Sequence, residues 1–330
     1  MSVARTPPPA NAPLNGAQPN QNWILADFLT QAQGQYNVVN RPRGPQGLFT
    51  LQNTPTGTAP PPAANNAIGA WWATWSLTPG TLSFGQTNGG FDAIELLRGE
   101  SLDPTNPSAW FTEFLQVRSD WFGLLNQQSP AFFTKALGLS SAKFSIDTPV
   151  GLARTYLKAN PMPSIDANGS PVLSGVLTAL QSGAAVASTG PFLDVSIGTT
   201  GPGGLVPGPV QSVTLNINLW MTDWLPVDEI RVIVNGSLAQ TISPAALALS
   251  AADPRLFSGS VTLPVAQLSG GADAWVVVEA GVPLAGPTIT LANQSLWDTW
   301  NAIMRSIYPI AVTNPIFVDV KGDGYPKPTS

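Results

Sequence analysis

The sequence predicts an α/β layer followed by a C-terminal β-sandwich. Before about residue 200, short apolar runs typical of strands alternate with a long helical pattern, which favours parallel strands joined by a helix. Further on, apolar and polar residues alternate strictly in "VTLNINLW" (213–220), as in a strand with one buried face. The Asn235-Gly236 pair then lies between two more strand-like runs, which is a strong hairpin signal.

The α/β layer is expected over residues 22–204, behind a proline-rich tail at 1–21 whose composition predicts disorder. The amphipathic stretch "NWILADFLTQAQGQ" predicts a short helix that leads into a strand at Val38–Asn40. A second strand is expected at Ala93–Leu97, and a third strand-to-loop segment in "FFTKALGLSSAK".

The clearest helix of the α/β layer is "NPSAWFTEFLQVRSDWFGLLNQ" (106–127). Asn106 suits the N-cap and Pro107 suits the first turn. Its apolar residues recur at helical spacing: Trp110, Phe114, Val117, Trp121 and Leu124. These residues form one apolar face of the expected helix.

A long proline-containing loop is expected at 50–70, and a tryptophan cluster follows it at Trp71, Trp72 and Trp75. Three tryptophans this close can form a stacking platform for sugar rings, but buried packing is the commoner use of such side chains. We expect buried packing here.

The β-sandwich is expected over residues 205–330, after the linker-like stretch "GTTGPGGLVPGPV" (198–210). "EIRVIVNGSLAQTI" predicts a hairpin, and "FSGSVTLPV" and "AWVVVEAGV" predict further strands. One late helix is expected in "SLWDTWNAIMRSIYP", and its apolar face can cover an open side of the sheet. We expect residues from about 205 to 328 to fold as a unit.

The composition excludes several classes of protein. The 330 residues include no cysteine and no histidine, so thiol catalysis, a Ser-His-Asp triad and the common type of zinc site are ruled out. The net charge of −5 offers no basic stripe for nucleic acid. No apolar run is long enough for a membrane span, and the first residues lack the pattern of a signal peptide, although the low charge and absence of cysteine are compatible with an exported protein.

Several motifs in order resemble one family. They are "NRPRG" at 40–44, "FDAIELL" at 91–97, "DWFGLLN" at 120–126, "GLSSAK" at 138–143, "TPVGLARTYL" at 148–157, "STGPF" at 188–192 and "VTNPIFVDVKGDG" at 312–324. This succession resembles the metallohydrolases of the PHP (polymerase and histidinol phosphatase) class, in the carbaryl-hydrolase-like CehA/McbA branch. The resemblance implies a (β/α) barrel followed by a β-sandwich. The His-x-His strand that opens the family's barrel has no counterpart here, so we expect only the second half of the barrel.

The departures from the family pattern fall on its metal ligands. Arg41 stands where the family has a histidine, and Ser141 and Lys143 stand where it has an aspartate and a histidine. The family uses divalent transition metals, but the cationic side chains of arginine and lysine have no lone pair to offer a metal. We therefore expect no metal and no other cofactor. Glu95 and Asp147 are the nearest acids in the pattern and are expected to pair with the new cations; the alternative is that all four are ordinary exposed loop charges.

This resemblance implies a non-catalytic relative of a PHP-type hydrolase that acts as a binding or structural module, for instance for a small anionic ligand. The alternative is an active metal-dependent hydrolase of phosphoesters, carbamates or esters, with ligands not recognised in the sequence or supplied by a partner chain. A half-barrel leaves a sheet edge unpaired, and it leaves apolar faces uncovered, including those of Trp71, Trp72, Trp110 and Trp121. Self-association or a partner chain that completes the barrel is therefore also expected.

The C-terminal motif "DVKGDG" has a second possible interpretation. Asp319, Lys321 and Asp323 alternate as in a calcium loop whose middle acid has been replaced. Calcium needs several oxygen ligands, and no bidentate glutamate follows. A structural turn is therefore the preferred interpretation.

Overall fold

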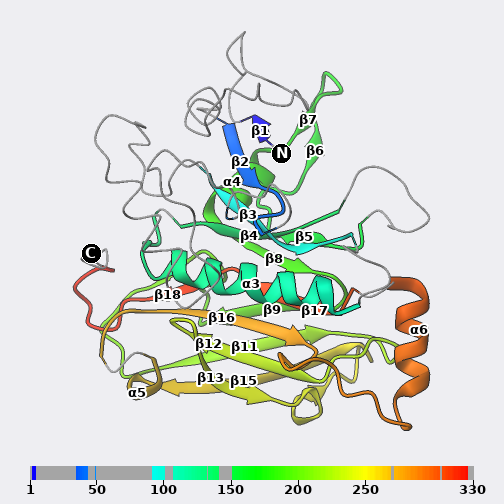
Figure 1. Ribbon diagram of the computed structural model, residues 1–330. Helices are drawn as coiled ribbons and strands as arrows, with labels where there is room; N and C mark the ends of the chain where they lie inside the picture. Colours follow the sequence, from blue (N-terminus) through cyan, green and yellow to red (C-terminus); the bar gives the residue numbers. More distant parts are fainter. Residues whose placement is uncertain are drawn as a thin grey trace. The chain divides into compact units, whose positions relative to one another are not determined.

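The computed structural model describes residues 2–4, 35–43, 49, 91–100, 107–131, 133–140, 151–268, 271–304 and 307–325 (Figure 1). In this part the chain is a mixed α/β protein built mostly of strands, and none of its sheets is closed. It divides into two compact units: the first holds residues up to 95 and 116–135, and the second holds 96–115 and 136–326. None of the helices described is long and apolar enough to cross a membrane.

The strands of the α/β region form one four-stranded sheet in the order β1-β2-β3-β4. Its strands are β1 (Ser2–Ala4), β2 (Gln35–Val39), β3 (Ala93–Arg98) and β4 (Lys135–Leu139). β2 and β3 are parallel, with Val38 opposite Ala93, as the sequence predicts. β1 is antiparallel to β2, so residues 2–4 of the tail expected to be disordered instead form a strand. Main-chain hydrogen bonds to β2 hold these residues in a strand, although the composition of the tail is typical of disorder.

Helix α3 (Pro107–Leu125) confirms the clearest helix prediction. Each of the five residues on its apolar face is at most 2% exposed: Trp110, Phe114, Val117, Trp121 and Leu124. The expectation that Trp110 and Trp121 are left uncovered is therefore wrong, because the chain itself buries both side chains. The spacing of the apolar residues in the sequence therefore identifies the face of the helix that is buried. Of the helix expected at 22–35, only Gln35 is described, and it is the first residue of β2. Residues 22–34, the loop at 50–70 and the tryptophan cluster at 71–75 lie outside the described residues.

Two large sheets make up the β-rich part of the second unit. The larger has eight strands: β10 (Leu205–Val206), β18 (Ile316–Val318), β16 (Ala274–Gly281), β17 (Ile310–Thr313), β8 (Ala185–Ser188) and β5 (Arg154–Leu157) in that order, with β12 (Glu229–Val234) and β13 (Ser237–Ile242) joined to it through β16. The smaller sheet has the order β14 (Ala248–Leu249), β15 (Leu256–Pro264), β11 (Ser212–Trp220), β9 (Phe192–Ile197). A separate hairpin consists of β6 (Ser164–Ile165) and β7 (Pro171–Val172).

The short helices of the second unit are α4 (Ser174–Ser182), η2 (Pro244–Ala246), α5 (Val265–Leu268) and α6 (Gln294–Met304). α6 confirms the late helix, and its Trp297 and Trp300 are buried. The alternation predicted for β11 is confirmed too, because Val213, Leu215 and Ile217 are all buried while the residues between them are not. β16 is buried on both faces, which explains its continuous apolar run.

The boundary expected at residue 205 does not separate the sheets. β9 pairs with β11 along six residues, and β8 pairs with β17, so strands before and after residue 205 belong to the same two sheets. The residue pattern changes there because β10 and β11 begin there, and no change of folding unit is needed to explain it.

Part of the stretch 198–210, expected to be a linker, joins the larger sheet as β10. Leu205 and Val206 pair in parallel with Phe317 and Val318. Two of its glycines lie where main chains approach closely: a Cβ on Gly203 would meet the carbonyl oxygen of Ser182 at 2.0 Å, and a Cβ on Gly208 would meet that of Asp319 at 2.0 Å. Gly203 also has a φ of 82°, in the left-handed region that favours glycine. Glycine and proline here mark close packing, a role that composition alone does not distinguish from a linker.

Asn314 ties β4 to the larger sheet. Its Oδ1 accepts the N–H of Ala136 at 2.8 Å, and its Nδ2 donates to the carbonyl oxygens of Ala136 and Ala185. Two residues further along β4, the hydroxyl of Thr155 accepts the N–H of Gly138 and donates to its carbonyl oxygen. Two side chains thus do for this side of β4 what a neighbouring strand would otherwise do.

Candidate functional site

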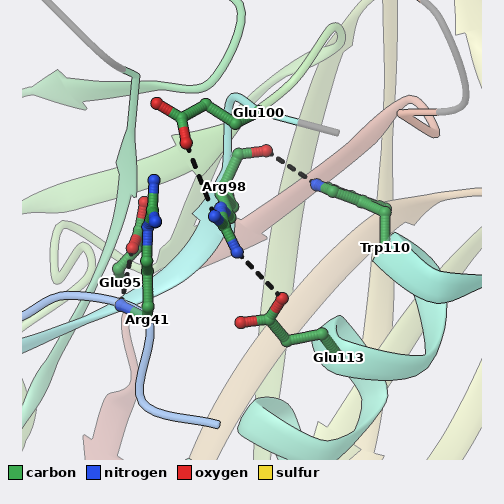
Figure 2. Close-up of polar contacts among 6 residues, drawn as sticks. All are labelled: Arg41, Glu95, Arg98, Glu100, Trp110 and Glu113. Atoms are coloured by element: carbon green, nitrogen blue, oxygen red, sulfur yellow. Dashed lines mark hydrogen bonds and ion pairs between the residues drawn. The ribbon is translucent and has the colours of Figure 1, made fainter. Parts of the chain in front are cut away.

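The structure describes two of the predicted site residues: Arg41 follows the end of β2, and Glu95 lies within β3. Because the strands are parallel, Arg41 and Glu95 come from neighbouring strands of one sheet. The main-chain N–H of Arg41 donates to Oε2 of Glu95 at 2.7 Å, and Glu95 is only 9% exposed (Figure 2). The structure therefore brings this pair together, through the main chain of Arg41. Ser141, Lys143 and Asp147 lie outside the described residues.

Arg41 has an unusual backbone conformation. Its φ of 50° lies in the left-handed region, which a residue with a long side chain seldom adopts. Such a conformation costs on the order of 1 kcal/mol and persists where the surroundings hold it, which is often at functional sites. The hydrogen bond from the Arg41 amide to a buried carboxylate is one such restraint, because a charged acceptor makes a strong bond.

Arg98, at the end of β3, forms a second charged group that the sequence reasoning missed. Its Nη1 lies 3.2 Å from a carboxylate oxygen of Glu113, and its Nη2 lies 3.4 Å from one of Glu100 (Figure 2). The indole N–H of Trp110 donates to the main-chain oxygen of Arg98 at 2.7 Å. These contacts tie the end of β3 to the first turns of α3. The sequence shows charges at these positions but does not show that helix and strand would bring them together.

Arg43 and Asp120 form a buried ion pair within the first unit. Nε and Nη2 of Arg43 lie 2.6 and 2.8 Å from the two carboxylate oxygens of Asp120, and Nη1 donates to the main-chain oxygen of Phe49. The side chains of Arg43 and Asp120 are 7% and 0% exposed. Burial raises the pKa of the Asp120 carboxyl, and the hydrogen bond and charge of Arg43 oppose that rise. Asp120 is the first residue of the "DWFGLLN" motif, and here it has a structural partner.

The residues described at the end of β2 and β3 do not fit a divalent transition metal. An arginine guanidinium has no lone pair for a metal, and the Glu95 carboxylate already accepts the Arg41 amide. Asp120 is bound on both oxygens by Arg43.

A group of three carboxylates lies elsewhere, in the second unit. Asp273, Asp319 and Asp323 place carboxylate oxygens within 4.8 Å of one another. Both oxygens of Asp319 accept main-chain N–H groups, from Gly322 at 2.7 Å and Gly324 at 3.0 Å, and Asp273 accepts the N–H of Val320. Burial, and then the charges of Asp319 and Asp323, raise the pKa of Asp273.

These bonds describe a turn held by aspartate side chains, as preferred for "DVKGDG". The sequence reasoning did not include Asp273, which precedes β16, because only the pairing of β16 with β18 brings it to the turn. Carboxylates are the hard oxygen donors that calcium takes, but three acids close together are common without an ion. The hydrogen bonds of the turn account for the positions of these carboxylates.

Comparisons with protein-family models, with curated proteins and with solved structures find no match.

Proposed function

We propose that this chain is a non-catalytic relative of the PHP-type metal-dependent hydrolases, of the CehA/McbA branch, and that it acts as a binding or structural module. The observation that carries the proposal is the Arg41–Glu95 contact. A cation stands where the resemblance places a metal-binding histidine, and the neighbouring carboxylate holds its main chain. The resemblance itself rests on the order of seven sequence motifs.

The chemistry of this strand end suits an anion better than a metal. The family pattern places Arg41 and Lys143 at former ligand positions, and both carry fixed positive charge at neutral pH. Arg41 is exposed, so a small anion in solution has access to it. Arginine also presents several N–H donors in a planar fork that matches carboxylate and phosphate groups. The binding partner that we propose is therefore a small anionic ligand.

The metal content of the purified full chain is the first test. We expect elemental analysis to find no stoichiometric zinc, manganese or iron, because three ligand positions of the family are Arg41, Ser141 and Lys143. We also expect no hydrolysis of a generic aryl phosphodiester when manganese or zinc is added. Two or more tightly held ions per chain, together with hydrolysis, would establish the alternative of an active hydrolase.

A restoration experiment tests the resemblance separately. The triple variant Arg41→His, Ser141→Asp, Lys143→His returns the family's residues to their positions, and we expect it to bind manganese or zinc more tightly than the parent chain in a calorimetric titration. Arg41→His alone is the matched control, since one imidazole makes a weak site. If the triple variant and the control bind equally weakly while both stay folded, the motif assignment is wrong.

A further inference from the structure

The sequence contains four Asn-Gly pairs, and the structure describes two of them, at 168–169 and 235–236. Both are followed by serine, so the two sites share the tripeptide Asn-Gly-Ser, and both lie in the turn of a β-hairpin. Asn-Gly is chemically special because glycine has no side chain to shield its main-chain nitrogen from the neighbouring amide carbon. The two sites are matched on the C-terminal side, where the reaction occurs, and they differ in the preceding residue, Ala167 or Val234, and in their structural setting.

Hydrogen bonds fix both the main chain and the side chain of Asn235. Its main-chain N–H donates to the Trp275 oxygen at 3.1 Å, its Oδ1 accepts the Trp275 N–H at 2.9 Å, and its Nδ2 donates to the Asp273 oxygen. The hairpin of β12 and β13 is also part of the eight-stranded sheet through the pairing of β12 with β16. The Asn235 amide can move only if this part of the sheet opens.

Asn168 lies in a hairpin that is much less well held than the hairpin of Asn235. β6 and β7 have two residues each and pair only with one another, and every residue from 161 to 171 is exposed. Asp166 holds the turn: its Oδ1 accepts the N–H groups of Asn168 and Ser170, and its main-chain oxygen accepts the N–H of Gly169. The structure places no hydrogen bond on the side-chain amide of Asn168 among the residues it describes, and the space where Gly169 would carry a Cβ is open.

The stability of these two turns sets how often each one opens. A two-stranded hairpin that buries no apolar face is at best marginally stable in water. Local opening of such a segment has a free energy near the low end for a folded protein, whereas a core strand approaches the global value. Gly169 therefore loses its hydrogen bond to Asp166 often, and Gly236 seldom leaves its turn.

We propose that Asn168 is a site of spontaneous deamidation and that the fold protects Asn235 from the same reaction. The main-chain nitrogen of Gly169 gives its proton to solvent base and attacks Cγ of Asn168. The new N–C bond closes a five-membered imide, and the side-chain nitrogen takes a proton and leaves as ammonia. Water then opens the imide at one carbonyl or the other, which gives aspartate or isoaspartate. The net reaction consumes one water and releases one ammonia, with no change of oxidation state.

The modification changes the character of the hairpin. A new carboxylate adds a negative charge close to Asp166, in a segment whose apolar side chains Met162 and Ile165 are 73% and 74% exposed. Isoaspartate also adds a methylene to the main chain, which the turn held by Asp166 cannot accommodate in register. The hairpin of β6 and β7 is therefore expected to open further after the reaction.

Peptide mapping by mass spectrometry on the full chain tests this proposal. After incubation at mildly alkaline pH, we expect the Asn168 peptide to convert about tenfold faster, or more, than the Asn235 peptide. In concentrated urea the two rates should become similar, because both sites then have the same Asn-Gly-Ser sequence. Equal rates in the native chain, or faster reaction at Asn235, would overturn the proposal.

A variant tests whether opening of the turn is the cause. Asp166→Ala removes the side-chain acceptor of two turn N–H groups, and we expect deamidation at Asn168 to accelerate several-fold while Asn235 is unchanged. Asp194, on β9, provides the control substitution Asp194→Ala, which should leave both rates as they are. If Asp166→Ala leaves the Asn168 rate unaltered, the turn does not limit the reaction and the structural explanation fails.

Discussion

At the scale of single residues, the buried ion pair of Arg43 and Asp120 shows how this chain places charge in its interior. Both are buried, and the arginine meets both carboxylate oxygens in a fork-like arrangement. A buried pair of this kind adds little net stability, but loss of one partner leaves an uncompensated charge in the interior. Replacing one partner alone is therefore expected to be costly, whereas replacing both with apolar residues is not.

We predict that Arg43→Met lowers the free energy of unfolding by about 3–5 kcal/mol at neutral pH. The pKa of Asp120 is already raised by burial, and loss of Arg43 raises it further. A carboxyl whose pKa is higher in the folded state binds its proton there first, so its stabilising contribution is present at low pH and is lost as pH rises. The deficit of the variant should therefore shrink as pH falls, in urea titrations at several pH values. The double variant Arg43→Met, Asp120→Leu should recover most of the loss; a deficit independent of pH would contradict this account.

At the scale of elements, the edges of the sheets are closed by devices that the sequence does not reveal. Asn314 and Thr155 satisfy alternate main-chain groups of β4 with their side chains, and glycines let the segment before β11 lie against β18. At β4, these side-chain bonds take the place of the regular main-chain bonds of a neighbouring strand.

We predict that Asn314→Ala destabilises the chain by about 3 kcal/mol, since the N–H and C=O of Ala136 lose their partner and each orphaned group costs about 1–3 kcal/mol. Chemical denaturation of the full chain measures the effect. Asn301→Ala, on an exposed position of α6, is the control and should change stability little. Equal effects of the two substitutions would show that Asn314 does not hold β4.

A pair of glycine substitutions tests whether residues 198–210 are packed. In Gly208→Ala the new Cβ would meet the Asp319 carbonyl oxygen at 2.0 Å, and main-chain atoms have little room to move away. We predict a loss of about 1–3 kcal/mol from this overpacking. In Gly201→Ala the nearest atom is the Val195 oxygen at 3.8 Å, so this control should cost at most about 0.5 kcal/mol. A linker would tolerate both changes equally.

At the scale of the whole molecule, the β-rich part is larger than the composition indicates, because β5, β8 and β9 belong to its sheets. We predict that a fragment of residues 2–326, which keeps β2 and Arg43, shows a cooperative thermal transition, whereas a fragment of 205–326 does not. The shorter fragment exposes the side of β17 that pairs with β8 and the side of β11 that pairs with β9. A sharp transition for the shorter fragment would support the boundary expected from the sequence.

The four-stranded sheet leads to a prediction about association. One side is closed, since side chains bond to β4, and at the other end the described residues place no strand beyond β1. Unpaired sheet edges invite pairing with another chain. We predict that the purified chain self-associates, with an apparent mass that falls on dilution in light scattering. A compact monomer at micromolar concentration that binds no apolar-surface dye would contradict this prediction.

The sequence by itself determined the elements whose signal is local. The helical spacing of Trp110 to Leu124, the alternation along β11 and the Asn235-Gly236 turn each follow from neighbours within a few residues, and the structure has all three. The family pattern led to the expectation that Glu95 pairs with Arg41, and the structure joins the two residues through the main-chain N–H of Arg41. Only the tertiary structure decided that the stretch 198–210 is packed, that Asp273 joins the turn of Asp319, and that Arg43 meets Asp120. Those contacts join residues far apart in the chain, and a pattern within one segment carries no information about which distant segment will pair with it.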